Sequence, residues 1–121
     1  MDTVQVSYGD YLFTPNPASI AVADRRDPAV TTLPGGGWLL EPVRLPRQAA
    51  LEGSLFAEDA AAALSRFEAL RQRYEAGGTA LLCLPGYPPF PARFIRLELT
   101  AEGDGRVLAY RAEFIEENTS Q

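Results

Sequence analysis

Few side chains in this sequence could take part in catalysis, because the chain contains no histidine. Histidine is the commonest general base near neutral pH, a frequent zinc ligand and the central residue of Ser-His-Asp triads. The single thiol, Cys83, has no histidine to activate it. It lies in the apolar run TALLCLP, which is typical of a small buried side chain. The sequence therefore excludes a nucleophile that is activated by histidine.

The carboxylates do not form a pattern that is typical of a catalytic or metal site either. Glu58 and Asp59 lie in the first turn of a predicted helix, where negative charge stabilises the start of the helix. Glu116 and Glu117 end a predicted strand and are expected to be solvated. The triple glycine at 35–37 lacks the Lys-Ser/Thr pair of a phosphate-binding loop. We expect no catalysis, cofactor or metal, and an enzyme that works through carboxylates alone is kept only as a third alternative.

The segment LPGYPPFPARF, residues 84–94, is the most unusual part of the chain, because prolines alternate with aromatic side chains between two predicted strands. Its PxxP spacing matches ligands of SH3 and WW domains, but such ligands normally lie in disordered tails. We interpret it as a stiff crossover whose tip contacts another subunit, since a preordered aromatic loop loses little entropy on binding. The candidate interface residues are Trp38, which follows the glycine loop, and Tyr87, Pro88, Pro89 and Phe90.

The elements that would hold these residues divide near residue 57. Residues 1–56 read as extended strands and loops, with a hairpin around Gly9-Asp10 and two short strands joined by a turn at DRRDP. PGGGW is expected to be a flexible loop. Pro42 and Pro46 confine the following segment to an edge strand or loop, and AALEGSLF is the better strand candidate.

Residues 57–117 read as one helix followed by a three-stranded segment, and residues 118–121 as a frayed tail. The helix covers about residues 58–76, with an apolar stripe at spacings of three and four and a stop at Gly77-Gly78. The apolar run TALLCLP predicts a buried strand, and alternation predicts strands in ARFIRLELT and RVLAYRAEFIEE. The expected core joins Ala63, Leu64, Phe67 and Leu70 of the helix to Leu82, Ile95, Leu97, Tyr110 and Phe114 of the sheet.

The composition fits a single domain over residues 1–121, long enough to bury a core without disulfides. The net charge of −5 argues against nucleic-acid binding, which requires a basic face. The N-terminus lacks the basic region and apolar run of a signal peptide, and no stretch approaches membrane-spanning length. We therefore expect a soluble protein from a reducing compartment, without nucleic-acid or membrane partners.

The order of these elements resembles small tail-tip and baseplate proteins of tailed bacteriophages. The strand AALEGSLF, the helix FEALRQRYEAGG, an apolar strand, the proline-aromatic loop, ARFIRLEL and YRAEFIEE carry the resemblance over residues 48–117. It is similar to the lambda-type minor tail protein M and to the N-terminal domain of distal tail proteins. The resemblance implies an α+β, mainly β fold, a small antiparallel split β-barrel with one helix packed on it.

The same resemblance implies a structural role without catalysis. The subunit would form a homo-oligomeric ring that joins the tail tube to the hub or fibres, with itself and other tail proteins such as tube and hub as partners. Its location would be the virion tail, assembled in the cytoplasm of the bacterial host, in a phage or a prophage-derived device. The alternative is a stand-alone binding module that uses the loop at 84–94.

Overall fold

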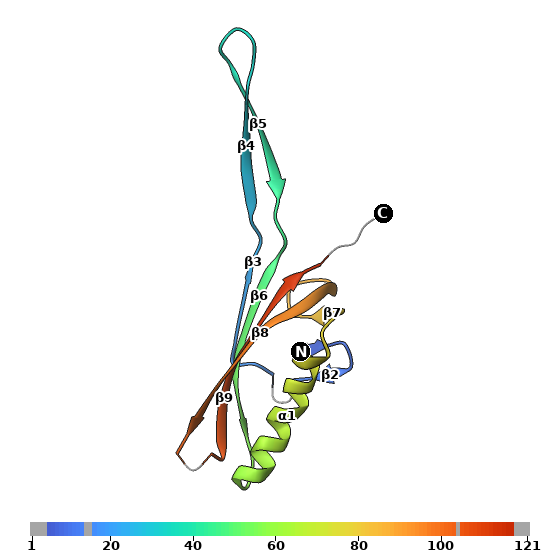
Figure 1. Ribbon diagram of the computed structural model, residues 1–121, viewed down its shortest axis with the longest axis vertical. Helices are drawn as coiled ribbons and strands as arrows, with labels where there is room; N and C mark the ends of the chain where they lie inside the picture. Colours follow the sequence, from blue (N-terminus) through green and yellow to red (C-terminus); the bar gives the residue numbers. More distant parts are fainter. Residues whose placement is uncertain (1–4, 14–15, 104, 118–121) are drawn as a thin grey trace.

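The computed structural model describes residues 5–13, 16–103 and 105–117 and shows a mainly β fold with one helix (Figure 1). The predicted frayed tail at 118–121 lies outside the described residues. The elements are β1 (Ser7–Tyr8), β2 (Tyr11–Leu12), β3 (Ser19–Ala23), β4 (Arg26–Thr32), β5 (Trp38–Arg44), β6 (Gln48–Phe56), α1 (Ala60–Ala76), β7 (Thr79–Cys83), β8 (Phe90–Glu102) and β9 (Val107–Glu116).

Seven of the strands form one antiparallel sheet in the order β2-β1-β7-β8-β9-β6-β3. Strands β4 and β5 form a separate two-stranded sheet. The predicted class, α+β and mainly β with one helix, is confirmed. Within the described residues, β2 and β3 end the large sheet and do not pair with each other. The sheet is therefore open, and the barrel implied by the resemblance is not closed.

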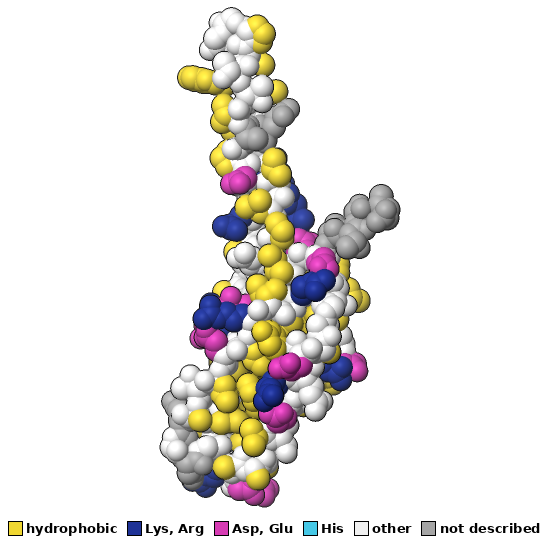
Figure 2. Space-filling view, viewed as in Figure 1, with side chains coloured by type: hydrophobic (Ala, Val, Ile, Leu, Met, Phe, Trp, Pro, Cys, Tyr) yellow, Lys and Arg dark blue, Asp and Glu magenta, His cyan; other side chains and the backbone are white. Residues whose placement is uncertain are grey.

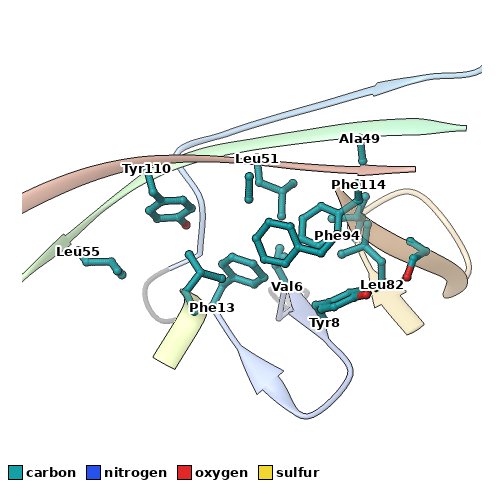
Figure 3. Close-up of a cluster of buried hydrophobic side chains, with 14 of the residues drawn as sticks. Val6, Tyr8, Phe13, Ala49, Leu51, Leu55, Leu82, Phe94, Tyr110 and Phe114 are labelled. Carbon is teal, nitrogen blue, oxygen red and sulfur yellow. Dashed lines mark hydrogen bonds between the residues drawn. The ribbon is translucent and has the colours of Figure 1, made fainter. Parts of the chain in front are cut away.

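The core is formed by residues of α1 and of the large sheet, and aromatic rings lie at its centre (Figure 3). The ring centroid of Phe114 lies 4.5 Å from that of Phe94 and 4.9 Å from that of Tyr8. Alternate residues of β9 are buried, as the sequence predicts. The helix begins after Asp59, whose carboxylate accepts a hydrogen bond from the Ala62 N–H, and ends at Gly77.

Two residues of the predicted core are exposed instead. Ile95 is 44% exposed because a β-bulge between Phe94 and Arg96 inserts one extra residue into β8. The bulge restores Leu97 to the core side and buries Phe94, which simple alternation had placed on the opposite face. Leu64 is 52% exposed, because the sheet covers a narrower stripe of the helix than the apolar pattern suggests.

The N-terminal half departs most from the prediction. The hairpin at Gly9-Asp10 is confirmed, but DRRDP is not a turn, because β3 leads into β4 through Asp24 and Arg25. The chain reverses at PGGGW instead, where Gly35 and Gly36 have φ values of 95° and 99°. Such left-handed angles strongly favour glycine. Strands β3 to β6 thus form one long hairpin whose outer half extends away from the body (Figure 1).

We predict that Gly53→Ala lowers the free energy of unfolding by about 1–3 kcal/mol, because it overpacks the core. A Cβ at this position of β6 would lie 2.8 Å from the Tyr110 hydroxyl and 3.1 Å from the Pro17 Cα. That hydroxyl is buried and has no hydrogen-bond partner within the described chain. Urea unfolding measures the loss, and Tyr110→Phe should recover part of it by removing the nearest atom. An unchanged midpoint for Gly53→Ala would contradict the close approach.

Candidate assembly surface

Strands β4 and β5, with the turn between them, form a two-stranded ribbon over residues 26–44 that projects from the body (Figure 1). Among the described elements, the backbone of each of these two strands lies close only to that of the other, and Arg44 at the base of β5 forms an ion pair with Glu116 of β9. An isolated two-stranded hairpin is at best marginally stable in water. Within the described part of the chain, the ribbon therefore lacks the packing that normally stabilises such a hairpin.

The ribbon also exposes a large amount of apolar side-chain surface, visible along its length in Figure 2. Its exposed large apolar residues are Val30, Leu33, Trp38, Leu39, Leu40 and Val43. Trp38 is 75% exposed, although aromatic side chains of this size are usually largely buried. Contiguous exposed apolar surface in a folded protein marks an interaction site. The ribbon is thus the strongest candidate surface for assembly.

The strand register divides these residues between the two faces of the ribbon. Val30 lies opposite Leu40, and Thr32 lies opposite Trp38. Because side chains alternate along a strand, these two pairs share one face with the Arg26 and Arg44 pair. We call this face the apolar face of the ribbon. It is apolar toward the turn and cationic at the base.

Arg47 ties the base of the ribbon to the proline-aromatic loop. Its Nε donates a hydrogen bond of 2.6 Å to the Oδ1 of Asp24, and its guanidinium lies 4.5 Å from the centre of the Tyr87 ring and 4.9 Å from that of Phe90. The Tyr87 hydroxyl donates to the other Asp24 oxygen at 3.4 Å. The hydrogen bond from Arg47 holds the pKa of Asp24 below its usual value. This cluster fixes the loop against the start of the ribbon.

The structure places the predicted interface residues in two separate regions. Trp38 begins β5 at the far end of the ribbon, whereas the loop lies beside the ribbon base. Pro88 and Pro89 are exposed and Tyr87 is half-buried. Phe90 is only 5% exposed and belongs to the core, so its side chain is not available to a neighbour in this conformation. The interface role of the other four stays a prediction.

Sequence reasoning missed Val30 and Leu40, although a signal for them existed. AVTTLPGGGWLLEPV is two extended runs around a glycine turn, which is a hairpin pattern. The apolar residues on both sides of the turn were read as short strands and a loop rather than as one exposed ribbon. The local sequence pattern predicts a hairpin but does not indicate whether the hairpin packs on the body or projects from it.

The carboxylates at the end of β9 form ion pairs rather than being merely solvated. Glu116 lies 2.8 Å from Arg44, and Glu117 lies 2.9 Å from Arg93. The Thr79 hydroxyl donates to Glu117 at 2.7 Å. Hydrogen bonds from Arg93 and Thr79 lower the pKa of Glu117 to about 2. These contacts give both carboxylates a structural role.

No three His, Cys, Asp or Glu side chains within the described part of the chain are grouped so as to hold a metal ion. None of the described helical structure is long and apolar enough to cross a membrane. Cys83 is a free thiol that is partly buried, not fully as expected.

No protein-family model matches the chain. No curated protein matches it either. Among solved structures, the Dit protein (gp 19.1) of phage SPP1 matches with a TM-score of 0.70 and 12% identity over 97% of this chain and 51% of that one. That structure is described as a paradigm of the hub adsorption apparatus in phages that infect Gram-positive bacteria. The present chain spans about half the length of that protein.

Two structures of gene transfer agent particles also match over nearly their whole chains. A chain from the tail of an empty particle, determined with C6 symmetry, has a TM-score of 0.57 and 14% identity over 96% of this chain and 92% of that one. A chain from the native virion has a TM-score of 0.59 and 13% identity with the same coverage. A specific likeness to the lambda-type minor tail protein M stays a prediction. The chain thus has the fold of proteins found in phage and gene transfer agent tails.

Proposed function

We propose that this chain is a structural subunit of the tail tip or baseplate of a phage or a prophage-derived particle. It forms a ring that joins the tail tube to the hub or fibres, and it carries out no catalysis. The observation that carries the proposal is the projecting ribbon, whose apolar side chains have no partner element within the described chain. The fold shared with tail proteins supports it.

The ribbon and the body are different surfaces, so an interface between them in neighbouring copies is heterologous. Heterologous contacts close into a ring when the rotation between copies allows it. The free edges of β4 and β5 offer further unpaired N–H and C=O groups for pairing with a neighbouring strand. In a closed ring, each ribbon would contact a neighbouring subunit, and this contact would bury its apolar face.

The partners and location follow from the same proposal. The partners are further copies of this chain together with tail tube and hub proteins, without nucleic acid or membrane. The location is the virion tail, after assembly in the host cytoplasm. The alternative, a stand-alone module that binds through residues 84–94, has less support because Arg47 and the core occupy Tyr87 and Phe90.

The proposal predicts that V30T/W38T/L40T weakens self-association by about 10- to 100-fold, as expected for the loss of interface anchors. Threonine keeps the preference for strand, so the ribbon itself should be retained. The matched control is L12T/F56T/L81T, which changes strand residues of the body that are 56%, 54% and 54% exposed. Sedimentation over a range of concentrations measures association, and electron microscopy shows whether the oligomer is a ring.

Two results would contradict this assignment. One is a wild-type protein that stays monomeric at every concentration, alone and with its tail partners. The other is a control triple variant that loses association while the ribbon variant keeps it, which would place the interface on the body.

A further inference from the structure

We propose that the arginines at the base of the ribbon bind carboxylate side chains of a second copy of this chain. The inference rests on the proposed function and adds the chemistry of the contact. The site is a hollow of about 520 Å³ that is lined by Asp24, Arg25, Arg26, Arg44 and Arg47. We call it the arginine hollow.

The arginine hollow concentrates positive charge in an acidic protein. The chain has 11 cationic residues, all arginine, against 16 acidic ones. Several of those arginines meet where the ribbon joins the body, and Figure 2 shows basic side chains on both sides of this region. Charge of one sign that gathers in a concave place attracts groups of the opposite sign.

The chain's own carboxylates neutralise only part of this charge. Arg47 pairs with Asp24 at 2.6 Å, and Arg44 pairs with Glu116 at 2.8 Å. Within the described residues, Arg25 and Arg26 have no ion pair or side-chain hydrogen bond. Arg26 also lies directly opposite Arg44, and like charges in that position destabilise a strand pair. Within the described part of one subunit, the positive charge of the hollow is therefore only partly balanced by carboxylates.

The position of Arg26 links this charge to assembly. Its side chain shares the apolar face of the ribbon with Leu40 and Trp38. A partner that covers this face from the turn to the base also removes water from the guanidinium groups. A desolvated charge without a partner is strongly unfavourable. The covering surface must therefore present hydrogen-bond acceptors at the base, and carboxylates match guanidinium groups best.

A second copy supplies such groups. Two chains that each carry a net charge of −5 repel unless their contact places opposite charges together. Asp27 and Glu58 have no ion-pair partner in the described part of the chain, so carboxylates remain for a contact between copies. A nucleic acid fits less well, because Asp24 and Glu116 stand among the arginines and would repel phosphate.

The test compares R25Q/R26Q with R66Q and the wild type. Arg66 is an exposed arginine of α1, outside the hollow. We expect R25Q/R26Q to weaken self-association at least ~10-fold at low salt and R66Q to leave it unchanged. The difference should shrink at high salt, because ions screen the contact. The melting temperature of the double variant at a concentration where it is monomeric should stay equal or rise, since one repulsion is removed.

Each contrary result has a distinct meaning. If the wild type assembles and R25Q/R26Q assembles equally well, the inference is wrong and the proposed function stands. If the wild type does not assemble at all, both fail. An early melting of the double variant would show that the arginines stabilise the subunit instead. If the double variant loses binding to a short DNA duplex in fluorescence anisotropy while its assembly is unchanged, the hollow binds phosphate and the inference is also overturned.

Discussion

Replacing Phe114 with alanine is expected to lower the free energy of unfolding by about 3–5 kcal/mol, as large core truncations do. Phe114 is 1% exposed and lies in β9, between β8 and β6. Its ring contacts those of Phe94 and Tyr8, so the truncation opens a cavity where three strands meet. Urea unfolding followed by far-ultraviolet circular dichroism measures the loss. Fluorescence is a poorer probe, because Trp38 lies on the exposed ribbon.

Phe56→Ala is the matched control for this change. Phe56 also lies in a strand of the large sheet, but it is 54% exposed. Its truncation should lower the free energy of unfolding by less than ~1 kcal/mol, because surface substitutions have small effects. Similar losses for both phenylalanines would show that the aromatic cluster is not the centre of the core.

The parts of the fold that were predicted from the sequence are those with local signals. The helix has a capping aspartate at Asp59, an apolar stripe and a glycine stop, all within the segment itself. Strand β9 alternates without interruption, so the buried side was identified correctly. The same reasoning failed for Phe94 and Ile95 in β8, because the bulge between Phe94 and Arg96 adds one residue, so one alternating pattern cannot fit the residues on both sides of it.

The candidate site was harder to predict because it depends on contacts between distant residues. Among the described elements, β4 lies close only to β5, so it lacks the alternation of buried and exposed residues that identifies a strand. Arg26 and Asp27 therefore lie in a strand where the sequence predicts a turn. Arg47 and Tyr87 are forty residues apart in the sequence, and nothing local shows that they stack. Of the apolar residues on the ribbon, the sequence analysis names only Trp38 as a candidate interface residue, and places it in a loop rather than on a projecting hairpin. Its function in assembly stays a prediction.

The proline-aromatic loop acquires a structural role from these contacts. Its prolines limit the freedom of the chain between β7 and β8, which lowers the entropy lost when the loop is ordered. Tyr87 then meets Arg47 and Asp24 at the point where the ribbon leaves the body. A rigid loop at that point restrains the direction of the ribbon. This restraint makes the free energy of assembly through the ribbon more favourable, because a preordered element loses less entropy on binding.

Phe90→Ala is therefore expected to lower the free energy of unfolding by about 3–4 kcal/mol, whereas Tyr87→Ala should lower it by only ~1 kcal/mol. Phe90 is 5% exposed and pairs with Leu82 in the sheet, so its truncation opens a cavity. Tyr87 is half-buried, and its removal costs mainly the cation–π contact with Arg47. Thermal and urea unfolding of the two variants in the monomeric state make the comparison. Small and equal losses would restore the original expectation that both rings are free for a neighbouring subunit. Unequal losses would show that the loop is anchored through Phe90 and that only its outer residues remain available to a partner.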